Sequence, residues 1–319
     1  MSTDAVGRMF THRSSPRDAI SPELRVLQKG LVLRSNSLLV TAFGDAFAPR
    51  RQAVWLGSLI DLMRLFNVAP RAVRTSASRL VDGEWLCVKP VGRRSYYGLS
   101  STGMLRVALA DRRIYEFRLP DWDGVWTMVM PGATLRSTVL RGLEHDLRWQ
   151  GFGRLSRNVF AHPRADLEAL QEILCAWQAQ TRTSVLSATH NTAFQFEALS
   201  RIMQDCFELD DVDVAWKQFL ARFDWLENRE TFAPAEAFYI RTLLIHEYRR
   251  VLLRDPNVPA ALLPEGWSGL RARALCERIY RKVVPPSEIY LQGTVETQDG
   301  RLKPTPHVIL SRLARGRAD

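Results

Sequence analysis

The sequence contains few cysteines, and no two of them lie close together: they are Cys87, Cys175, Cys206 and Cys276. Structural zinc sites and disulfide frameworks depend on closely spaced cysteines, so we expect neither, and a reducing compartment fits. No apolar run approaches the ~20 residues that span a bilayer, and the polar N-terminus lacks the apolar stretch of a secretory signal. We therefore expect a soluble, cytoplasmic protein that has no membrane contact, metal or other cofactor.

Acidic residues are scarce relative to basic ones. The 319 residues include 34 Asp and Glu against 44 Lys and Arg, which gives a net charge of +10 and a pI near 9.9. The excess is concentrated in residues 34–100, which hold ten basic and four acidic residues, whereas residues 191–285 are close to neutral. A local excess of positive charge favours a polyanionic partner such as nucleic acid.

Motifs of nucleophilic catalysis are missing as well. The chain has no G-x-S-x-G sequence, and no cysteine accompanies His246 and Glu247. Adjacent residues on a helix point in different directions, so these two do not form a natural dyad. We predict no catalytic residue and no enzyme activity.

Residues 34–103 show the element order of a winged helix-turn-helix domain. Three segments with apolar residues at helical spacing are followed by two short strands that a basic turn connects. The expected helices are 35–47, 54–67 and 69–80, and the expected strands are 85–90 and 95–100. Pro70 suits the first turn of the third helix.

The remaining chain predicts two further domains. Residues 123–190 follow the order βαββαβ, which is typical of a ferredoxin-like domain, and residues 191–285 contain only helical patterns. The expected helices there are 193–208, 211–228, 234–254 and 268–283, with Pro285-Pro286 ending the domain. Residues 1–33 are expected to be a disordered arm, 104–122 a connector and 286–319 a polar tail. The fold class is thus multidomain α+β.

The segment 69–80 predicts a helix with one apolar and one basic face. Val73, Ala77 and Leu80 fall on a narrow side at 100° per residue, which we expect to be buried. The opposite side and its edges carry Arg71, Arg74, Thr75, Ser78 and Arg79. Short hydroxyl residues allow close approach to base edges, and arginines read guanine or grip phosphate. We interpret this as a recognition helix; the alternative is a basic helix that only contacts water.

The expected hairpin adds a second basic surface. Lys89, Arg93 and Arg94 lie at or near its tip, where a wing contacts the phosphate backbone of DNA. A solvated turn is the alternative interpretation. Together with the helix, these residues predict a site for double-stranded DNA.

Several longer motifs stand out along the chain: GD (44–45), AVRTSASRLVDGEWL (72–86), GRRSYYGLS (92–100), GFGRL (151–155) and IHEYRRVLLRDPNVPAALLPEGW (245–267). These motifs resemble those of PaaX-type transcriptional regulators. The resemblance covers roughly residues 30–285. It implies a bacterial repressor of phenylacetate catabolism that phenylacetyl-CoA releases from its operator. We expect a homodimer whose two-fold symmetry matches an imperfect palindrome.

The middle domain of that family resembles a small ferredoxin-like CRISPR-associated nuclease. Nucleolytic members carry an acidic residue at the end of the first strand, where it holds a metal. Here the strand ends in MVMPG (128–132), and the nearest acid, Asp123, precedes it. We therefore interpret this domain as a scaffold or dimer interface.

An acyl-CoA effector needs aromatic side chains for its apolar group and cations for its phosphates. The predicted effector-binding residues are Tyr239, His246, Tyr248, Arg249, Arg250 and Arg254. We place them in a cleft between the ferredoxin-like and helical domains. The alternative is that the aromatic residues belong to a helical core.

Two other functions stay open at this point. One is a regulator that responds to a different acyl-CoA or aromatic metabolite, or to none. The other is a metal-dependent nuclease that uses the ferredoxin-like domain, which the missing strand-end acid opposes.

Overall fold

The computed structural model describes residues 19–117, 121–191, 201, 205–207, 209–304, 307, 309 and 312. Their contacts divide them into two compact units. Unit 1 holds the described residues up to Phe117, then Ala221–Tyr248, and those from Leu275 onward. Unit 2 holds the described residues from 121 to Leu220, and Arg249–Ala274. The residues predicted as a separate helical domain are therefore distributed over both units.

Unit 1 is built on a five-stranded sheet with the order β2-β3-β1-β8-β9. The strands are β1 (Val54–Trp55), β2 (Leu86–Val91), β3 (Arg94–Leu99), β8 (Glu296–Thr297) and β9 (Gly300–Arg301). The predicted hairpin is confirmed, with Val91 opposite Arg94. Only two residues form its turn, and Gly92 has φ +58°, a conformation that such tight turns require and glycine adopts readily.

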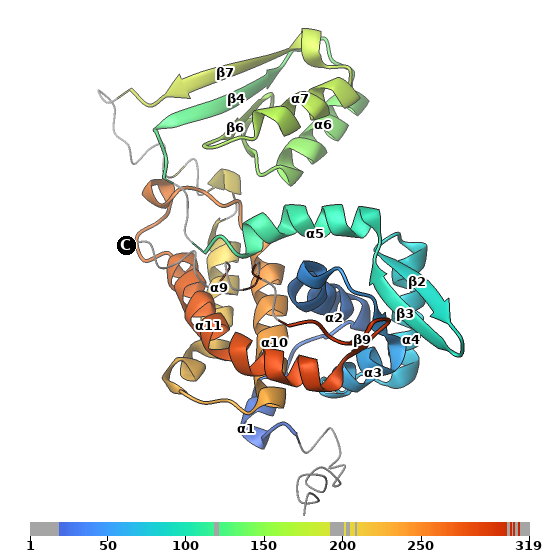
Figure 1. Cartoon of the computed structure of the whole chain (residues 1–319). Coiled ribbons are helices and arrows are strands. Elements are labelled where there is room, and N and C mark those ends of the chain that lie inside the picture. Colours follow the sequence, from blue (N-terminus) through green and yellow to red (C-terminus); the bar gives the residue numbers. More distant parts are fainter. Residues whose placement is uncertain are drawn as a thin grey trace, which may run out of the picture. The chain divides into compact units, whose positions relative to one another are not determined.

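Unit 1 includes, in whole or in part, several helices that Figure 1 labels. Among them are α1 (Pro22–Arg25), α2 (Ser35–Ala42), α3 (Leu56–Arg64), α4 (Pro70–Asp82), α5 (Ser101–Ile114), α10 (Pro234–Leu252) and α11 (Ser268–Thr294). A π-helical turn over Phe43–Phe47 continues α2. The three helices predicted before the hairpin are confirmed, with ends that differ by a few residues. Among the described helices, none combines the length and apolarity needed to cross a bilayer.

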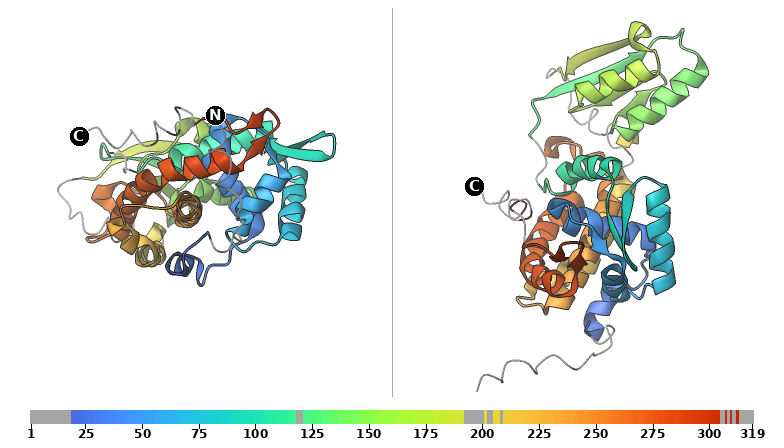
Figure 2. Two further views of the ribbon diagram at one scale, coloured as in Figure 1. Left: turned by 60° about the horizontal axis from the view of Figure 1, so that its bottom comes forward. Right: turned by 45° about the vertical axis from the view of Figure 1, so that its right-hand side comes forward.

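Unit 2 contains a four-stranded antiparallel sheet with the order β5-β6-β4-β7. Its elements are β4 (Val125–Pro131), α6 (Ser137–Trp149), β5 (Gly153–Ser156), β6 (Val159–His162), α7 (Leu167–Ala176) and β7 (Thr183–Thr189). The predicted succession βαββαβ is confirmed. Figures 1 and 2 show α6 and α7 together on one face of the sheet. Leu143, Leu147 and Leu170 of these helices pack there against Val129 and Phe160 of the strands.

Unit 2 also contains most of α9 (Leu209–Phe223), whose residues from Ala221 onward belong to unit 1. It corresponds to most of the helix predicted over 211–228, and α10 corresponds to the helix predicted over 234–254. The helix predicted over 193–208 lies mainly outside the described residues.

Part of the predicted disordered arm is packed into unit 1. From residue 19 onward the chain is described, and Ile20, Leu24 and Leu27 are buried. The side chain of Arg222, at the end of α9, donates to the backbone oxygens of Leu27 and Lys29 at 2.6 and 2.9 Å. The expectation of disorder is therefore wrong for residues 19–33, because their apolar side chains find partners from distant parts of the chain. Residues 1–18 lie outside the described part.

The predicted end of the last helix at Pro285-Pro286 is also wrong, since α11 runs through both prolines to Thr294. Proline lacks the N–H that continues a helix, but buried contacts hold the segment beyond the pair. Ser287 Oγ donates to the Val284 carbonyl at 2.8 Å, and Glu288 is buried.

The predicted polar tail, residues 286–319, contributes to the core of unit 1. Its strands β8 and β9 extend the sheet, with Thr297 opposite Val54 of β1. Ile309 and Arg312 are both buried. The described part of this segment therefore belongs to the same folded unit as the predicted winged helix.

A buried network of charges joins these distant segments. Asp45, in the π-helical turn, accepts hydrogen bonds from Arg241 Nε at 2.6 Å, Tyr115 at 2.5 Å and Tyr280 at 2.7 Å. Arg241 also donates to Glu288 at 2.6 Å. Tyr115 directly follows α5, Arg241 lies in α10, and Tyr280 and Glu288 lie in α11. The network therefore connects the extension of α2 to α5, α10 and α11.

Two further arginines complete this network. Arg50 pairs with the second carboxylate oxygen of Glu288. Arg312 donates to the Asp45 carbonyl at 3.0 Å and pairs with Asp111. Burial alone raises the pKa of Asp45, but the positive charges of Arg241 and Arg312 outweigh it and hold that pKa below its usual value. The Asp45 carboxylate is therefore ionised in the folded protein.

Replacing Asp45 with Asn is expected to destabilise the protein by about 3–5 kcal/mol at pH 7, because Arg241 and Arg312 lose a buried counter-ion. Urea unfolding measures the change. The folded-state pKa of Asp45 is lowered, so its stabilisation is present above the unfolded pKa of about 4 and is lost as the pH falls further. The difference between the two proteins is thus expected to shrink below about pH 4.

Asp61→Asn is the matched control, because Asp61 pairs with Arg64 on the surface, where both side chains are 47% exposed. We expect a change below about 1 kcal/mol. Equal effects of the two substitutions would contradict a structural role for the network.

Candidate nucleic-acid interface

Helix α4 follows α3 after a short turn and buries the face predicted from the sequence. Asn67 in the turn has φ +60°, and Pro70 begins α4. Val73, Ala77 and Leu80 are buried, at 0%, 0% and 6% exposure. The orientation of α4 about its own axis is therefore set by these apolar contacts.

The other face of α4 is open to solvent. Its five predicted DNA-binding residues are all exposed: Arg71, Arg74, Thr75, Ser78 and Arg79. Among the described residues, no hydrogen bond or ion pair involves the side chains of the three arginines. Thr75 donates to the Arg71 carbonyl at 3.0 Å, a contact within the helix. Guanidinium groups in this state offer all their donors to phosphates or guanine edges.

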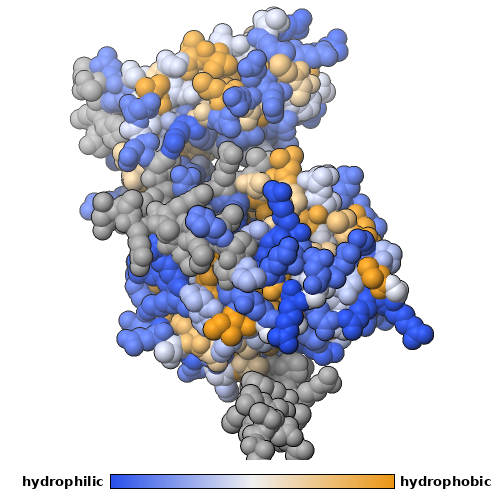
Figure 3. Space-filling view, viewed as in Figure 1, coloured by the Kyte–Doolittle hydropathy of each residue, from blue (hydrophilic) through white to orange (hydrophobic). Residues whose placement is uncertain are grey.

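The hairpin β2–β3 carries the second predicted basic surface. Lys89, Arg93 and Arg94 are exposed, and Figure 3 shows hydrophilic side chains projecting at the end of this hairpin. Arg94 differs from the other two, because it pairs with Glu296 of β8 and lies over the Trp55 ring at 4.5 Å. Sequence reasoning missed this partner, since Glu296 is about 200 residues away and has no local signal.

The corner between α4 and β2 is held in place by α5. Ser100 caps that helix by accepting from the Gly103 amide at 2.9 Å, and it also donates to the Glu84 carbonyl at 2.5 Å. A Cβ atom at Gly103 would lie 2.1 Å from the Trp85 carbonyl, so only glycine fits. Arg106 donates to the Gly83 carbonyl at 3.2 Å. These contacts couple the position of the hairpin to that of α4.

The six predicted effector-binding residues are divided between the two units. Tyr239, His246 and Tyr248 belong to unit 1 and are buried, whereas unit 2 holds Arg249, Arg250 and Arg254. Arg250 and Arg254 are exposed. The structure thus places the two halves of the set in different surroundings.

The aromatic members of this set pack in the core of unit 1. Tyr239 stacks on Phe66, with ring centroids 5.1 Å apart, and donates to Gln28 at 3.2 Å. Burial raises the pKa of Tyr239 to about 12. The ring of Tyr248 packs against that of Phe117, with ring centroids 5.8 Å apart. A ligand reaches these rings only by displacing core side chains.

His246 lies on α10 between Tyr239 and Tyr248 in the sequence. Its Nδ1 atom is 3.1 Å from the Thr41 hydroxyl of α2. This contact joins α10 to the helix that precedes the π-helical turn. The histidine therefore has a structural partner in the same core.

Replacing Tyr239 with Ala is expected to destabilise the ligand-free protein by about 3–5 kcal/mol, as for other large buried aromatic residues. Thermal unfolding without ligand measures the loss. Tyr239→Phe keeps the stacked ring and removes only the hydrogen bond to Gln28, so it should cost about 1 kcal/mol. Unchanged stability of the alanine variant would show that the ring is not part of the core.

The chain matches two family models. Residues 34–103 match the model of PaaX-like protein, and residues 207–293 match that of the PaaX-like protein C-terminal domain. An uncharacterized protein, Rv0674, from Mycobacterium tuberculosis has a similar fold, with a TM-score of 0.54 and 21% sequence identity over 79% of this chain and 96% of that chain.

The Transcriptional repressor PaaX of Escherichia coli (strain K12) is 35% identical to this chain over 276 residues. The aligned part covers 85% of this chain and 87% of that repressor. This identity over nearly the full length, together with both family models, shows that the chain belongs to the family of PaaX-like proteins.

Proposed function

We propose that this protein is a DNA-binding transcriptional repressor, the function that the name of its Escherichia coli relative states for that protein. The observation that carries the proposal is the exposed face of α4. It presents Arg71, Arg74 and Arg79 with no protein partner among the described residues. The arginines in the core of unit 1 are instead paired with carboxylates, so the three arginines of this face differ from them in having open donors.

Residues 34–103 serve in this proposal as a winged helix-turn-helix domain. Three helices precede the hairpin, and β1 pairs with β3 to give the small sheet of such a domain. Helix α4 enters the major groove, where Thr75 and Ser78 allow close approach. Lys89 and Arg93 contact phosphates, and Arg94 joins them after exchanging Glu296 for a phosphate.

Residues 123–190 form a ferredoxin-like domain in this proposal, which the strand order and the two helices on one face support. It acts as a scaffold or as the interface of a homodimer bound to a palindromic operator. The nuclease alternative gains no support from β4, because the nearest acid, Asp123, precedes the strand and accepts the Val125 amide at 2.9 Å.

The effector in this proposal is phenylacetyl-CoA or a related acyl-CoA, as the family resemblance implies. Of the predicted effector residues, Arg250 and Arg254 are exposed cations suited to the CoA phosphates. The effector must bind a conformation with low DNA affinity more tightly, because equal affinity for both conformations shifts nothing.

Arg74→Ala and Arg79→Ala are each expected to weaken binding to the DNA upstream of the protein's own gene by about 1–3 kcal/mol if the side chain reads a base. Loss of a phosphate contact instead lowers the slope of log K against log salt by about one unit. Fluorescence anisotropy at several salt concentrations distinguishes the two. Arg148→Ala on α6 is the control, since Arg148 is also an exposed arginine, and an equal loss there would contradict the assignment to α4.

Phenylacetyl-CoA is expected to release the protein from this DNA, and free phenylacetate is expected to be less effective because it lacks the phosphates. The same anisotropy assay, titrated with either compound, measures the release. If neither compound changes DNA binding, the proposed effector is contradicted, whereas the proposed repressor function is not. Magnesium-dependent cleavage of the DNA would instead support the nuclease alternative.

A further inference from the structure

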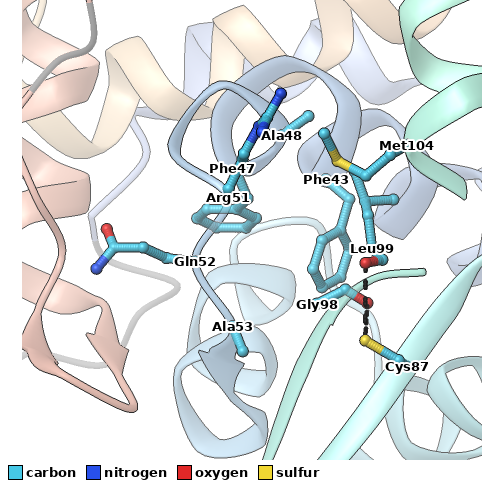
Figure 4. Close-up of a pocket in the computed structure, with 10 residues that line it drawn as sticks. All are labelled: Phe43, Phe47, Ala48, Arg51, Gln52, Ala53, Cys87, Gly98, Leu99 and Met104. Carbon is cyan, nitrogen blue, oxygen red and sulfur yellow. Dashed lines mark hydrogen bonds between the residues drawn. The ribbon is translucent and has the colours of Figure 1, made fainter. Parts of the chain in front are cut away.

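A cavity of about 370 Å³ lies at the base of the hairpin, within unit 1 (Figure 4). Most of its lining is apolar, from Phe43 and Phe47 of the π-helical turn, Leu99 of β3 and Met104 of α5. The rings of Phe43 and Phe47 pack edge to face, with centroids 5.4 Å apart. Three separate parts of the fold thus line one mainly apolar space that is open to solvent on one side.

The size of this space suits a small ring compound. A cavity of about 150 Å³ lined by apolar residues already binds benzene, and small-molecule sites begin at about 300 Å³. A benzene ring with a short substituent is therefore accommodated, whereas a whole coenzyme is not.

Arg51 adds a cation to the lining of the cavity. Its side chain is exposed, and no hydrogen bond or ion pair with another described residue involves it. Its neighbour Arg50 is fully engaged with Glu288, the Ala46 carbonyl and the Lys303 carbonyl. The backbone of Arg51 is left-handed, with φ +50°, where the short helical turn Ala48–Arg50 ends.

We propose that this cavity is a ligand site for a small aromatic group whose compound also carries an anion, with the ring among Phe43, Phe47 and Leu99 and the anionic group at Arg51. The anion is either the carboxylate of a free aryl acid or a phosphate of an aryl-acyl-CoA that extends out of the cavity. This site differs from the effector residues predicted on α10, whose aromatic members are in the core.

Occupancy of this site is linked to DNA binding, an inference that rests on the proposed function. One wall of the cavity is the base of the hairpin that carries Arg93, and another is the extension of α2. A ligand with different affinity for two positions of the hairpin shifts their populations and with them the DNA affinity.

Cys87 provides a direct probe, because it lines the cavity and is an exposed free thiol. Cys175 is also an exposed free thiol, in unit 2, and serves as the internal control. The full-length protein is treated with iodoacetamide, and mass spectrometry follows both alkylation rates with phenylacetate, phenylacetyl-CoA, acetyl-CoA or no ligand. We expect phenylacetate or phenylacetyl-CoA to slow the reaction of Cys87 several-fold and to leave Cys175 unchanged.

The ligand that protects Cys87 identifies the source of the anion. Protection by phenylacetate assigns it to the carboxylate, and protection by phenylacetyl-CoA alone assigns it to the CoA phosphates. Acetyl-CoA lacks the ring and should not protect. Protection by acetyl-CoA equal to that by phenylacetyl-CoA, or no protection by any of the three, overturns the proposal.

Arg51→Gln tests the cation, and Arg34→Gln, at another exposed arginine of unit 1, is the matched control. We expect the ligand concentration for half-protection of Cys87 to rise about tenfold or more in the first variant only, because a hydrogen bond to a charged group is lost. Equal concentrations for both variants overturn the role of Arg51.

Gly98→Ala tests the space itself. A Cβ atom at Gly98 lies 3.5 Å from Ala53 and 3.9 Å from Cys87 Sγ, which are ordinary contacts, so the protein should fold. Gly44→Ala is the control, because its Cβ meets only Val107, at 3.8 Å. We expect weaker protection in the first variant alone, and unaltered protection there overturns the assignment to the cavity.

Parallel DNA-binding measurements separate this proposal from the proposed function. Protection of Cys87 in a protein that does not bind its upstream DNA supports the site and contradicts the repressor. DNA binding without any protection of Cys87 supports the repressor and contradicts the site.

Discussion

The pairing of buried charges around Asp45 is the constraint on which unit 1 depends. An unpaired charge in a protein interior is very costly, so Asp45, Arg241 and Glu288 must be buried together or not at all. Their segments lie at 45, 241 and 288 in the chain and meet in one core. The predicted winged helix, the long helices α10 and α11 and the C-terminal segment therefore fold as parts of one structure.

The same constraint divides the arginines into those that are buried and paired and those that are exposed. Arg50, Arg241 and Arg312 are buried, and each forms an ion pair with a buried carboxylate. The arginines of α4 have no such partners among the described residues, and their charge is left for an external anion. Neighbouring arginines differ in the same way. Arg50 and Arg94 form ion pairs with Glu288 and Glu296, whereas the side chains of Arg51 and Arg93 have no ion-pair partner among the described residues.

The elements closest to the proposed DNA site were predictable because their signals are local. The apolar spacing of Val73, Ala77 and Leu80 specifies both a helix and its buried face. A two-residue turn with Gly92 specifies the hairpin. Alternation of strand and helix patterns over 123–190 likewise needs no partner from elsewhere in the sequence, and all these elements are present in the structure.

The sequence by itself determined the helices and the hairpin of residues 56–99, the strands and helices of residues 125–189, where the positive charge gathers, and to which family the motifs point. Only the tertiary structure decided that residues 19–33 and the segment beyond Pro286 belong to the core, that Tyr239 and Tyr248 pack inside it, and that a cavity remains beside Arg51. The physical reason is the distance along the chain between the residues that interact. Periodicity and turn chemistry act between residues close in the chain, whereas burial of a charge or a ring depends on partners up to 267 residues away, as for Asp45 and Arg312.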